Sequence, residues 1–100
     1  MKAIIATTAG GPEVLEYTDV PEPTPGPAEV VVKVTAAGVN FIDTYRRAGV
    51  YPMQFPHVVG SEGAGTVVEV GPEAAAKVGD RVAWNAGPGS YAEYVKVPVH

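Results

Sequence analysis

The sequence contains no cysteine, which excludes disulfide bonds and every metal site built on thiolates. It also contains no apolar run close to the roughly 20 residues that a membrane-spanning helix requires. Near the start, the apolar run of residues 3–6 is too short for the apolar region of a signal peptide. We therefore expect a soluble, cytoplasmic protein with no membrane partner.

Positive charge is sparse as well. Seven Lys and Arg residues stand against eleven Asp and Glu residues, for a net charge of −4. The acidic excess falls in residues 1–29, where Lys2 is the only basic residue. Because no stretch offers the basic surface that a nucleic-acid backbone attracts, nucleic acid is not an expected partner. With 46% hydrophobic residues, the 100-residue chain has enough apolar material for one folded domain.

Short β-branched segments separated by glycine and proline turns indicate a mainly β domain. The clearest strand is residues 29–36, EVVVKVTA, in which Val30, Val32 and Val34 would share one face. Residues 21–27 contain four prolines and cannot donate to a β ladder, so they are expected to form a surface loop. Further strands are expected at residues 2–7, 14–17, 63–70, 81–85 and 90–97.

One segment, NFIDTYRRAG at residues 40–49, has the pattern of a short helix. Asn40 is a suitable N-cap, Asp43 follows at the spacing of a capping box, and Tyr45 belongs to an apolar set at helical spacing. Gly49 is placed to end the helix. Asp43 and the two arginines that follow it are expected on a solvated face, although an arginine near a cleft could instead meet a cofactor phosphate.

The run VVGSEGAGTVVEVG, residues 58–71, raises the question of a phosphate-binding loop. A dinucleotide fingerprint needs Gly-x-Gly-x-x-Gly followed by a helix. Here Gly60, Gly63 and Gly65 have the reverse spacing, and the β-branched residues after them predict a strand. We expect these glycines to allow sharp bending and close backbone approach. Glu62 among them is either solvated or held by an internal partner.

Three segments in order, AAGVNFIDTYRRAGVYP, VVGSEGAGTVVEVG and KVGDRVAW, resemble the N-terminal domain of the medium-chain dehydrogenase/reductase superfamily. Within it, the chain is most similar to the zinc-independent NADPH:quinone oxidoreductase branch, the ζ-crystallin-like proteins. The resemblance covers essentially all 100 residues. It implies a GroES-like, partly open β-barrel over residues 1–100, while the Rossmann cofactor domain of the family is absent from this sequence.

The resemblance further implies the substrate-side half of an active site, where hydride passes from nicotinamide to a quinone or similar small carbonyl acceptor. The main NADPH site would lie on the Rossmann domain, so the isolated chain is expected to be inactive and to self-associate through its exposed cleft face. A zinc-free enoyl reductase of the same superfamily is one alternative. A stand-alone GroES-like binding or structural module is another.

Three residues match active-site positions of that family. Asn40 matches an asparagine that lies beside the nicotinamide ring, and its alternative role is the helix N-cap. Tyr45 and Tyr51 match two tyrosines that line the substrate pocket, where a hydroxyl could donate to the acceptor oxygen; their alternative role is packing. Zinc-dependent relatives have cysteine at the position of Asn40 and histidine at that of Ser61, so no zinc site is expected.

Overall fold

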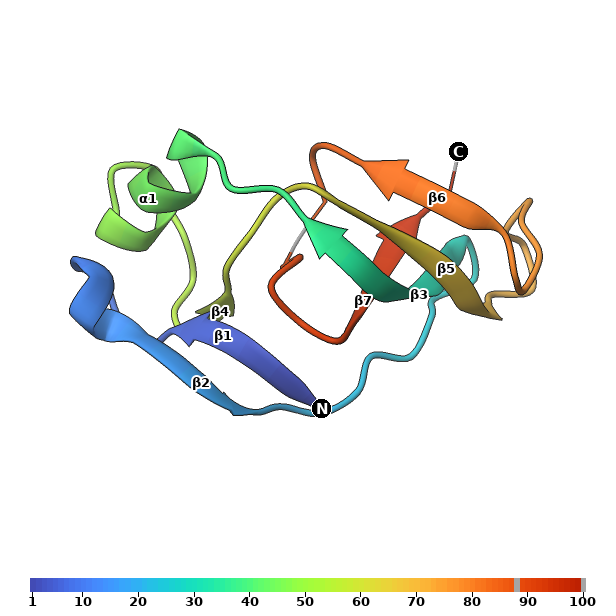
Figure 1. Ribbon diagram of the computed structural model, residues 1–100, viewed down its shortest axis with the longest axis horizontal. Helices are drawn as coiled ribbons and strands as arrows, with labels where there is room; N and C mark the ends of the chain where they lie inside the picture. Colours follow the sequence, from blue (N-terminus) through green and yellow to red (C-terminus); the bar gives the residue numbers. More distant parts are fainter. Residues whose placement is uncertain (88, 100) are drawn as a thin grey trace.

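The computed structural model describes residues 1–87 and 89–99. Its strands form two antiparallel sheets: sheet A has the order β2-β1-β4 and sheet B has the order β6-β5-β3-β7 (Figure 1). The expected mainly β fold with one short α-helix is confirmed. In chain order the elements are β1 (Lys2–Ala6), η1 (Pro12–Val14), β2 (Leu15–Asp19), β3 (Glu29–Ala37), α1 (Phe41–Ala48), β4 (His57–Val58), β5 (Gly63–Val70), β6 (Arg81–Trp84) and β7 (Tyr94–Pro98).

The two sheets are joined through residues 91–93, which precede β7. Ile4 of β1 donates its backbone N–H to the carbonyl oxygen of Tyr91 at 2.8 Å. Val34 of β3 donates its backbone N–H to the carbonyl oxygen of Glu93 at 2.9 Å. One short segment therefore contacts a strand of each sheet, and the two sheets form a partly open barrel rather than a closed one.

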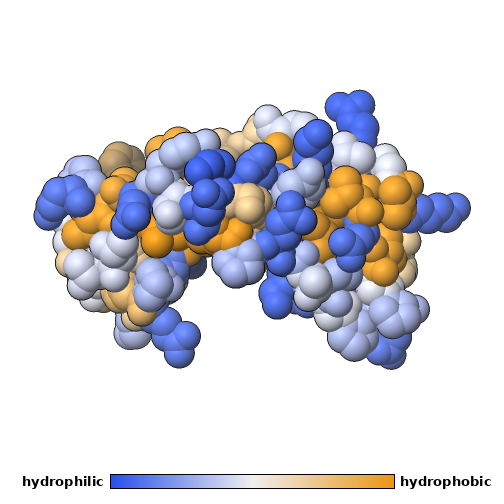
Figure 2. All heavy atoms as spheres, turned by 90° about the horizontal axis from the view of Figure 1, so that it is seen from below, coloured by the Kyte–Doolittle hydropathy of each residue, from blue (hydrophilic) through white to orange (hydrophobic). Residues whose placement is uncertain are grey.

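The molecule is elongated, with extents of 38 × 24 × 22 Å. Sheet A and α1 occupy one end, and sheet B occupies the other (Figure 1). Seen from below, each end carries its own hydrophobic area, and hydrophilic side chains lie between the two areas (Figure 2). Among the described residues, sheet B contains a fully buried cluster of valines.

Strand β3 lies at the centre of that cluster. Val30 and Val32 are buried on one face of β3 together with Val67 of β5. Val31 is buried as well, so β3 is covered on both faces and not on one alone. Full burial of a valine side chain contributes about 1.5 kcal/mol or more to stability, and these residues anchor sheet B.

Most strand ends differ from the sequence-based expectation, usually by one or two residues, and three differences have a clear structural reason. β7 begins at Tyr94, later than the predicted residue 90, because the residues just before it bond to two different strands. β2 begins at Leu15, because Pro12–Val14 form the single turn η1. The sequence did not predict β4, since a strand of two residues is too short to show an alternating pattern.

Among the glycines of β5, Gly65 is the one at which the backbone of β3 comes closest. A Cβ atom at this position would overlap the carbonyl oxygen of Lys33 and lie 2.8 Å from Cγ1 of Val32. The pairing between the two strands also shifts beside this position, between Val34 and Ala36. Gly65 therefore has the close backbone approach that the sequence indicated for the glycine run.

We predict that Gly65→Ala lowers the free energy of unfolding by about 2–3 kcal/mol, because β5 and β3 must move apart to admit a methyl group. Urea unfolding followed by circular dichroism measures the change. Thr66→Ala, one residue along β5, is the control and should cost less than about 1 kcal/mol, since it removes atoms from a half-buried side chain. Equal stability of the two variants would contradict the close approach.

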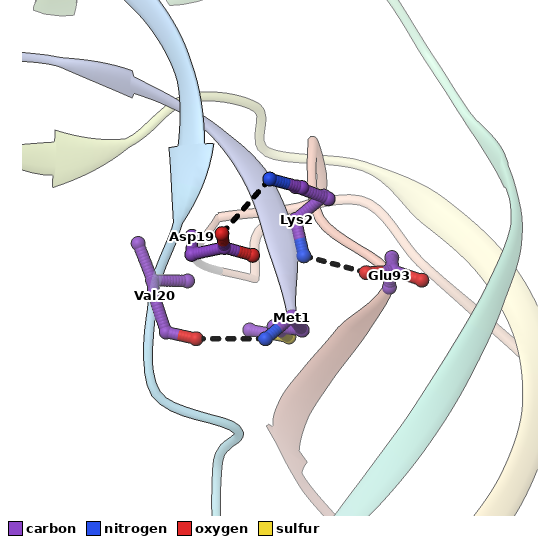
Figure 3. Close-up of polar contacts among 5 residues, drawn as sticks. All are labelled: Met1, Lys2, Asp19, Val20 and Glu93. Carbon is purple, nitrogen blue, oxygen red and sulfur yellow. Dashed lines mark hydrogen bonds and ion pairs between the residues drawn. The ribbon is translucent and has the colours of Figure 1, made fainter.

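Polar contacts hold β1 at the N-terminus (Figure 3). The amino group of Met1 donates to the carbonyl oxygen of Val20 at 3.0 Å. Lys2 donates from Nζ to Oδ2 of Asp19 at 2.8 Å, and from its backbone N–H to the carboxylate of Glu93. The hydrogen bond and the charge of Lys2 lower the pKa of Asp19, and Asp19 likewise raises the pKa of Lys2. Because these side chains are 45% and 73% exposed, salt screens the pair strongly.

We predict that Asp19→Asn removes a small part of the acid sensitivity of folding. Since the pKa of Asp19 is lowered in the folded state, its carboxylate adds stability above its unfolded value of about 3.9 and loses it as pH falls through the lowered value. The wild type should therefore melt at a higher temperature than Asp19→Asn near neutral pH, and this gap should narrow and then close as the pH falls below the unfolded value and through the lowered folded one.

The melting temperatures of the wild type and Asp19→Asn are compared at low salt across that pH range. Glu16→Gln, which replaces an exposed carboxylate on the same strand, serves as the control. A gap that keeps its size down to the lowest pH would mean that the charge of Asp19 does not stabilise the fold.

Candidate functional site

Helix α1 turns its apolar face toward solvent. Phe41 is 82% exposed and Tyr45 is 45% exposed, whereas Asp43 is only 6% exposed. Arg46 and Arg47 in the last turn are half-buried. Surface helices normally have the opposite arrangement, with the apolar face inward. The expectation that Asp43 and the two arginines form a solvated face is therefore wrong: Asp43 is buried, both arginines are half-buried, and polar contacts hold Asp43 and Arg47 against the domain.

The Asp43 carboxylate is satisfied by two hydrogen bonds, as a buried charge requires. Its Oδ2 accepts from the backbone N–H of Asn40 at 3.1 Å, which is the capping-box contact, and its Oδ1 accepts from Oγ of Ser61 at 3.1 Å. Asn40 has extended backbone angles and is the N-cap of α1, as predicted. Ser61 is itself buried just before β5, so this carboxylate joins the start of the helix to the start of a strand.

The other end of α1 is attached to the loop between β1 and η1. Arg47 donates from Nε to the carbonyl oxygen of Gly10 at 3.0 Å, and Gly10 donates its backbone N–H to the carbonyl oxygen of Arg47 at 3.0 Å. The helix ends at Gly49, as the sequence predicted, where φ is +84°. Polar contacts therefore position both ends of a helix whose apolar side chains point outward.

Tyr45 and Tyr51 lie side by side on the outward face. Their ring centroids are 6.1 Å apart and their planes meet at 63°, an edge-to-face arrangement. The structure thus brings together two residues whose proximity the sequence left open. The segment that carries them, residues 39–53, has a set of exposed large apolar residues that we call the apolar surface: Val39, Phe41, Ile42, Tyr45, Val50, Tyr51 and Met53. Concentrated apolar exposure of this kind marks a surface that binds a ligand or another protein unit.

A pocket of about 320 Å³ lies beside the domain-facing side of α1, and Met53 is the one residue of the apolar surface that lines it. Asp43 and Arg46 line it, together with mostly apolar residues from β4, β7 and the neighbouring loops. Neither Tyr45 nor Tyr51 contributes to this pocket, and Asn40 does not line it either. The predicted tyrosines therefore belong to the exposed apolar surface and not to this pocket.

Tyr91 lies close to the carboxylate of Asp43. Burial raises the pKa of the Tyr91 phenol, and the negative charge of Asp43 raises it further. The chain reaches this arrangement through Gly60, where φ is +104° and where a Cβ atom would lie 2.7 Å from the Tyr91 ring. Asp43 thus faces three parts of the chain, namely the start of α1, Ser61 and the segment before β7.

Two other residues near the glycine run lie away from the tyrosines. Glu62 is half-buried, and its carboxylate lies against Gly38, where a Cβ atom would overlap it. Trp84 packs against the valine core, and its Nε1 is buried without a hydrogen-bond partner among the described residues. Glu62 is therefore packed against backbone rather than fully solvated, and its position next to Gly38 accounts for the absence of a side chain there.

The sequence did not single out Ser61 as a partner of Asp43, because 18 positions separate the two residues. The one available signal was the spacing of Asn40 and Asp43, which predicts a capping box but not burial. Within residues 1–87 and 89–99, no group of three or more His, Asp or Glu side chains is arranged to hold a metal ion. No helix in these same ranges has the length and hydropathy needed to cross a membrane.

Comparison with known proteins relates this geometry to a family. The alcohol dehydrogenase GroES-like domain matches residues 26–100. A quinone oxidoreductase of Pseudomonas aeruginosa is 55% identical over 95 residues, which cover 92% of this chain and 29% of that protein. The human quinone oxidoreductase is 41% identical over 105 aligned positions, which cover 100% of this chain and 32% of that protein. This chain therefore spans about 30% of the length of these curated relatives.

Solved structures agree with this relationship. The quinone oxidoreductase of Pseudomonas syringae has a TM-score of 0.93 and 53% identity, over 97% of this chain and 31% of that one. The Escherichia coli quinone oxidoreductase complexed with NADPH has a TM-score of 0.93 and 37% identity, over 97% of this chain and 31% of that one. The GroES-like fold and the resemblance to quinone oxidoreductases are confirmed. This chain belongs to the alcohol dehydrogenase GroES-like domain family.

Proposed function

We propose that this chain is the substrate-side domain of an NADPH-dependent quinone oxidoreductase, which passes a hydride from nicotinamide to a quinone or similar small carbonyl acceptor. The observation that carries the proposal is the reversed orientation of α1, which presents Tyr45 beside Tyr51 within an exposed apolar surface. The similarity to quinone oxidoreductases, one of them complexed with NADPH, supports the same class of reaction.

The two tyrosines suit a planar acceptor. Their rings offer faces and edges on which a quinone can stack, and the hydroxyls of Tyr45 and Tyr51 can donate to its carbonyl oxygen. Arrival of a hydride places negative charge on that oxygen, so a donor already in position lowers the barrier. Phe41 and Val50 next to them would exclude water once the surface is covered, which strengthens such hydrogen bonds.

The residues of this chain fit the nicotinamide end of the cofactor better than its phosphates. NADPH supplies the hydride when it is bound. Asn40, at the start of the helix that carries Tyr45, has amide donors and an acceptor suited to the nicotinamide carboxamide. The glycine run, in contrast, leads into the strand β5 and not into a helix N-terminus that would bind a pyrophosphate. We therefore infer that the main NADPH site belongs to a Rossmann domain outside these 100 residues, with no requirement for zinc.

Two alternatives predict different behaviour. A zinc-free enoyl reductase of the same superfamily would use a tyrosine hydroxyl in a similar way on a different acceptor. A stand-alone GroES-like module would need no second domain, but seven exposed apolar side chains around one short helix favour a surface that another part covers. We expect the uncovered chain to self-associate through this surface at high concentration.

We predict that the 100-residue chain alone neither binds NADPH saturably nor oxidises it in the presence of a small ortho-quinone. Joined to the remaining part of the Pseudomonas aeruginosa quinone oxidoreductase, it should gain both activities, because that part would supply the cofactor domain. Fluorescence titration and the absorbance of NADPH follow the two steps. Saturable binding of NADPH by the chain alone would contradict the proposal that it carries only the substrate side of the active site. Preference of the fusion protein for an enoyl thioester over the quinone would support the enoyl reductase alternative.

In the same fusion, Tyr45→Phe and Tyr51→Phe should identify the hydroxyl that donates to the acceptor. Loss of that donor should lower kcat/KM for the quinone by about 100-fold, while the KM for NADPH stays the same. Tyr17→Phe is the matched control, since Tyr17 is an exposed tyrosine of β2 outside the apolar surface. If both variants match the control, the two hydroxyls have no role in the reaction.

A further inference from the structure

No large apolar side chain of helix α1 is fully buried: Phe41 is 82% exposed, Tyr45 45% and Ile42 36%. Specific polar contacts attach the helix at its two ends. Arg47 and Gly10 exchange two hydrogen bonds at the C-terminal end. At the N-terminal end, Asp43 bonds both to the helix start and to Ser61 just before β5. At the N-terminal end, the orientation of the helix about its own axis therefore depends on Asp43; at the other end it depends on Arg47, which is four residues later on the same face.

Helix geometry converts this orientation into the direction of Tyr45. Residues two positions apart on an α-helix, such as Asp43 and Tyr45, are separated by about 200° around the helix axis. Their side chains therefore point to nearly opposite sides. When Asp43 faces inward to Ser61, Tyr45 must face outward, where its ring meets that of Tyr51. The burial of Asp43 at 6% exposure and the 45% exposure of Tyr45 are two results of the same rotation.

The surroundings of Asp43 favour this inward position alone. Ser61 is 4% exposed, and its hydroxyl donates to Oδ1 in a buried contact. Oδ2 is engaged by the backbone N–H of Asn40, so each carboxylate oxygen has a donor. Removal of either donor leaves part of a charged group without a partner away from water, which is the arrangement that buried charges avoid.

We propose that Asp43 is a positioning residue. Through its hydrogen bond from Ser61, it fixes the rotation of α1 and so places Tyr45 against Tyr51 and Asn40 at the helix start. The catalytic meaning of this placement rests on the proposed quinone oxidoreductase function, in which Asp43 itself touches neither acceptor nor cofactor. The placement itself is a property of the 100-residue chain and can be measured on that chain.

Ser61→Ala tests the proposal, because it removes the donor to Oδ1 and leaves the capping contact of Asp43 in place. On the 100-residue chain, NMR measures the nuclear Overhauser contact between the rings of Tyr45 and Tyr51 and the amide exchange of α1. We expect the ring contact to weaken strongly and exchange in α1 to accelerate by about 10-fold or more, while amides of β3 keep their protection. Ser61→Thr, which retains a hydroxyl, should restore both.

Ser90→Ala is the matched control. Ser90 is also a buried serine, 1% exposed, but its Oγ has no hydrogen-bond partner among the described residues. Its removal should therefore leave the ring contact and the exchange of α1 unchanged. An unchanged ring contact in Ser61→Ala would overturn the proposal. Equal acceleration in α1 and β3 would also overturn it, since this would mean a general loss of stability.

A second variant and a second readout separate this proposal from the proposed function. Asp43→Asn keeps one acceptor oxygen where two are needed, so it should reproduce the NMR changes of Ser61→Ala. In the fusion with the cofactor domain, Ser61→Ala should lower kcat/KM for the quinone by about 10-fold without raising the KM for NADPH. If the fusion reduces no quinone, the proposed function fails, whereas the NMR result on the chain alone still decides the role of Asp43.

Discussion

A carboxylate that folding removes from water must receive hydrogen bonds, and the candidate site depends on how Asp43 meets that requirement. Its two oxygens accept from Asn40 at the helix start and from Ser61 next to β5. Leaving such a buried group without one of its donors costs about 1–3 kcal/mol, which is enough to favour a single orientation of a short helix. The apolar side of α1 is exposed because the polar side is required inside.

The same arrangement shows how a mainly β domain presents the candidate site on its one α-helix. Sheet B supplies a rigid support through its valine core, and residues 91–93 connect it to β1 of sheet A. Helix α1 adds little to that core. It instead carries Tyr45, with Asn40 directly before the helix and Tyr51 three residues after its end. In the function that we propose, such a site is incomplete, since the exposed apolar surface has no cover within the described residues.

The relationship to quinone oxidoreductases agrees with this incompleteness. The chain spans about 30% of the curated relatives, and its fold matches the corresponding part of the solved enzymes at a TM-score of 0.93. Phenol hydroxyls beside an apolar surface are suited to polarise a carbonyl oxygen, but they supply no reducing equivalents. The chemistry that we propose therefore divides between two parts: this chain orients and polarises the acceptor, and a cofactor domain delivers the hydride.

The sequence by itself determined the local features, because these depend on neighbouring residues. The alternation of valines specified β3 and β5, and the spacing of Asn40, Asp43 and Gly49 specified where α1 begins and ends. The quoted motifs also indicated the family. Only the tertiary structure decided which face of α1 lies inward, since a helical period describes two faces without assigning either to the core. That assignment was made by Ser61, 18 positions from Asp43, through a hydrogen bond that no local pattern can encode.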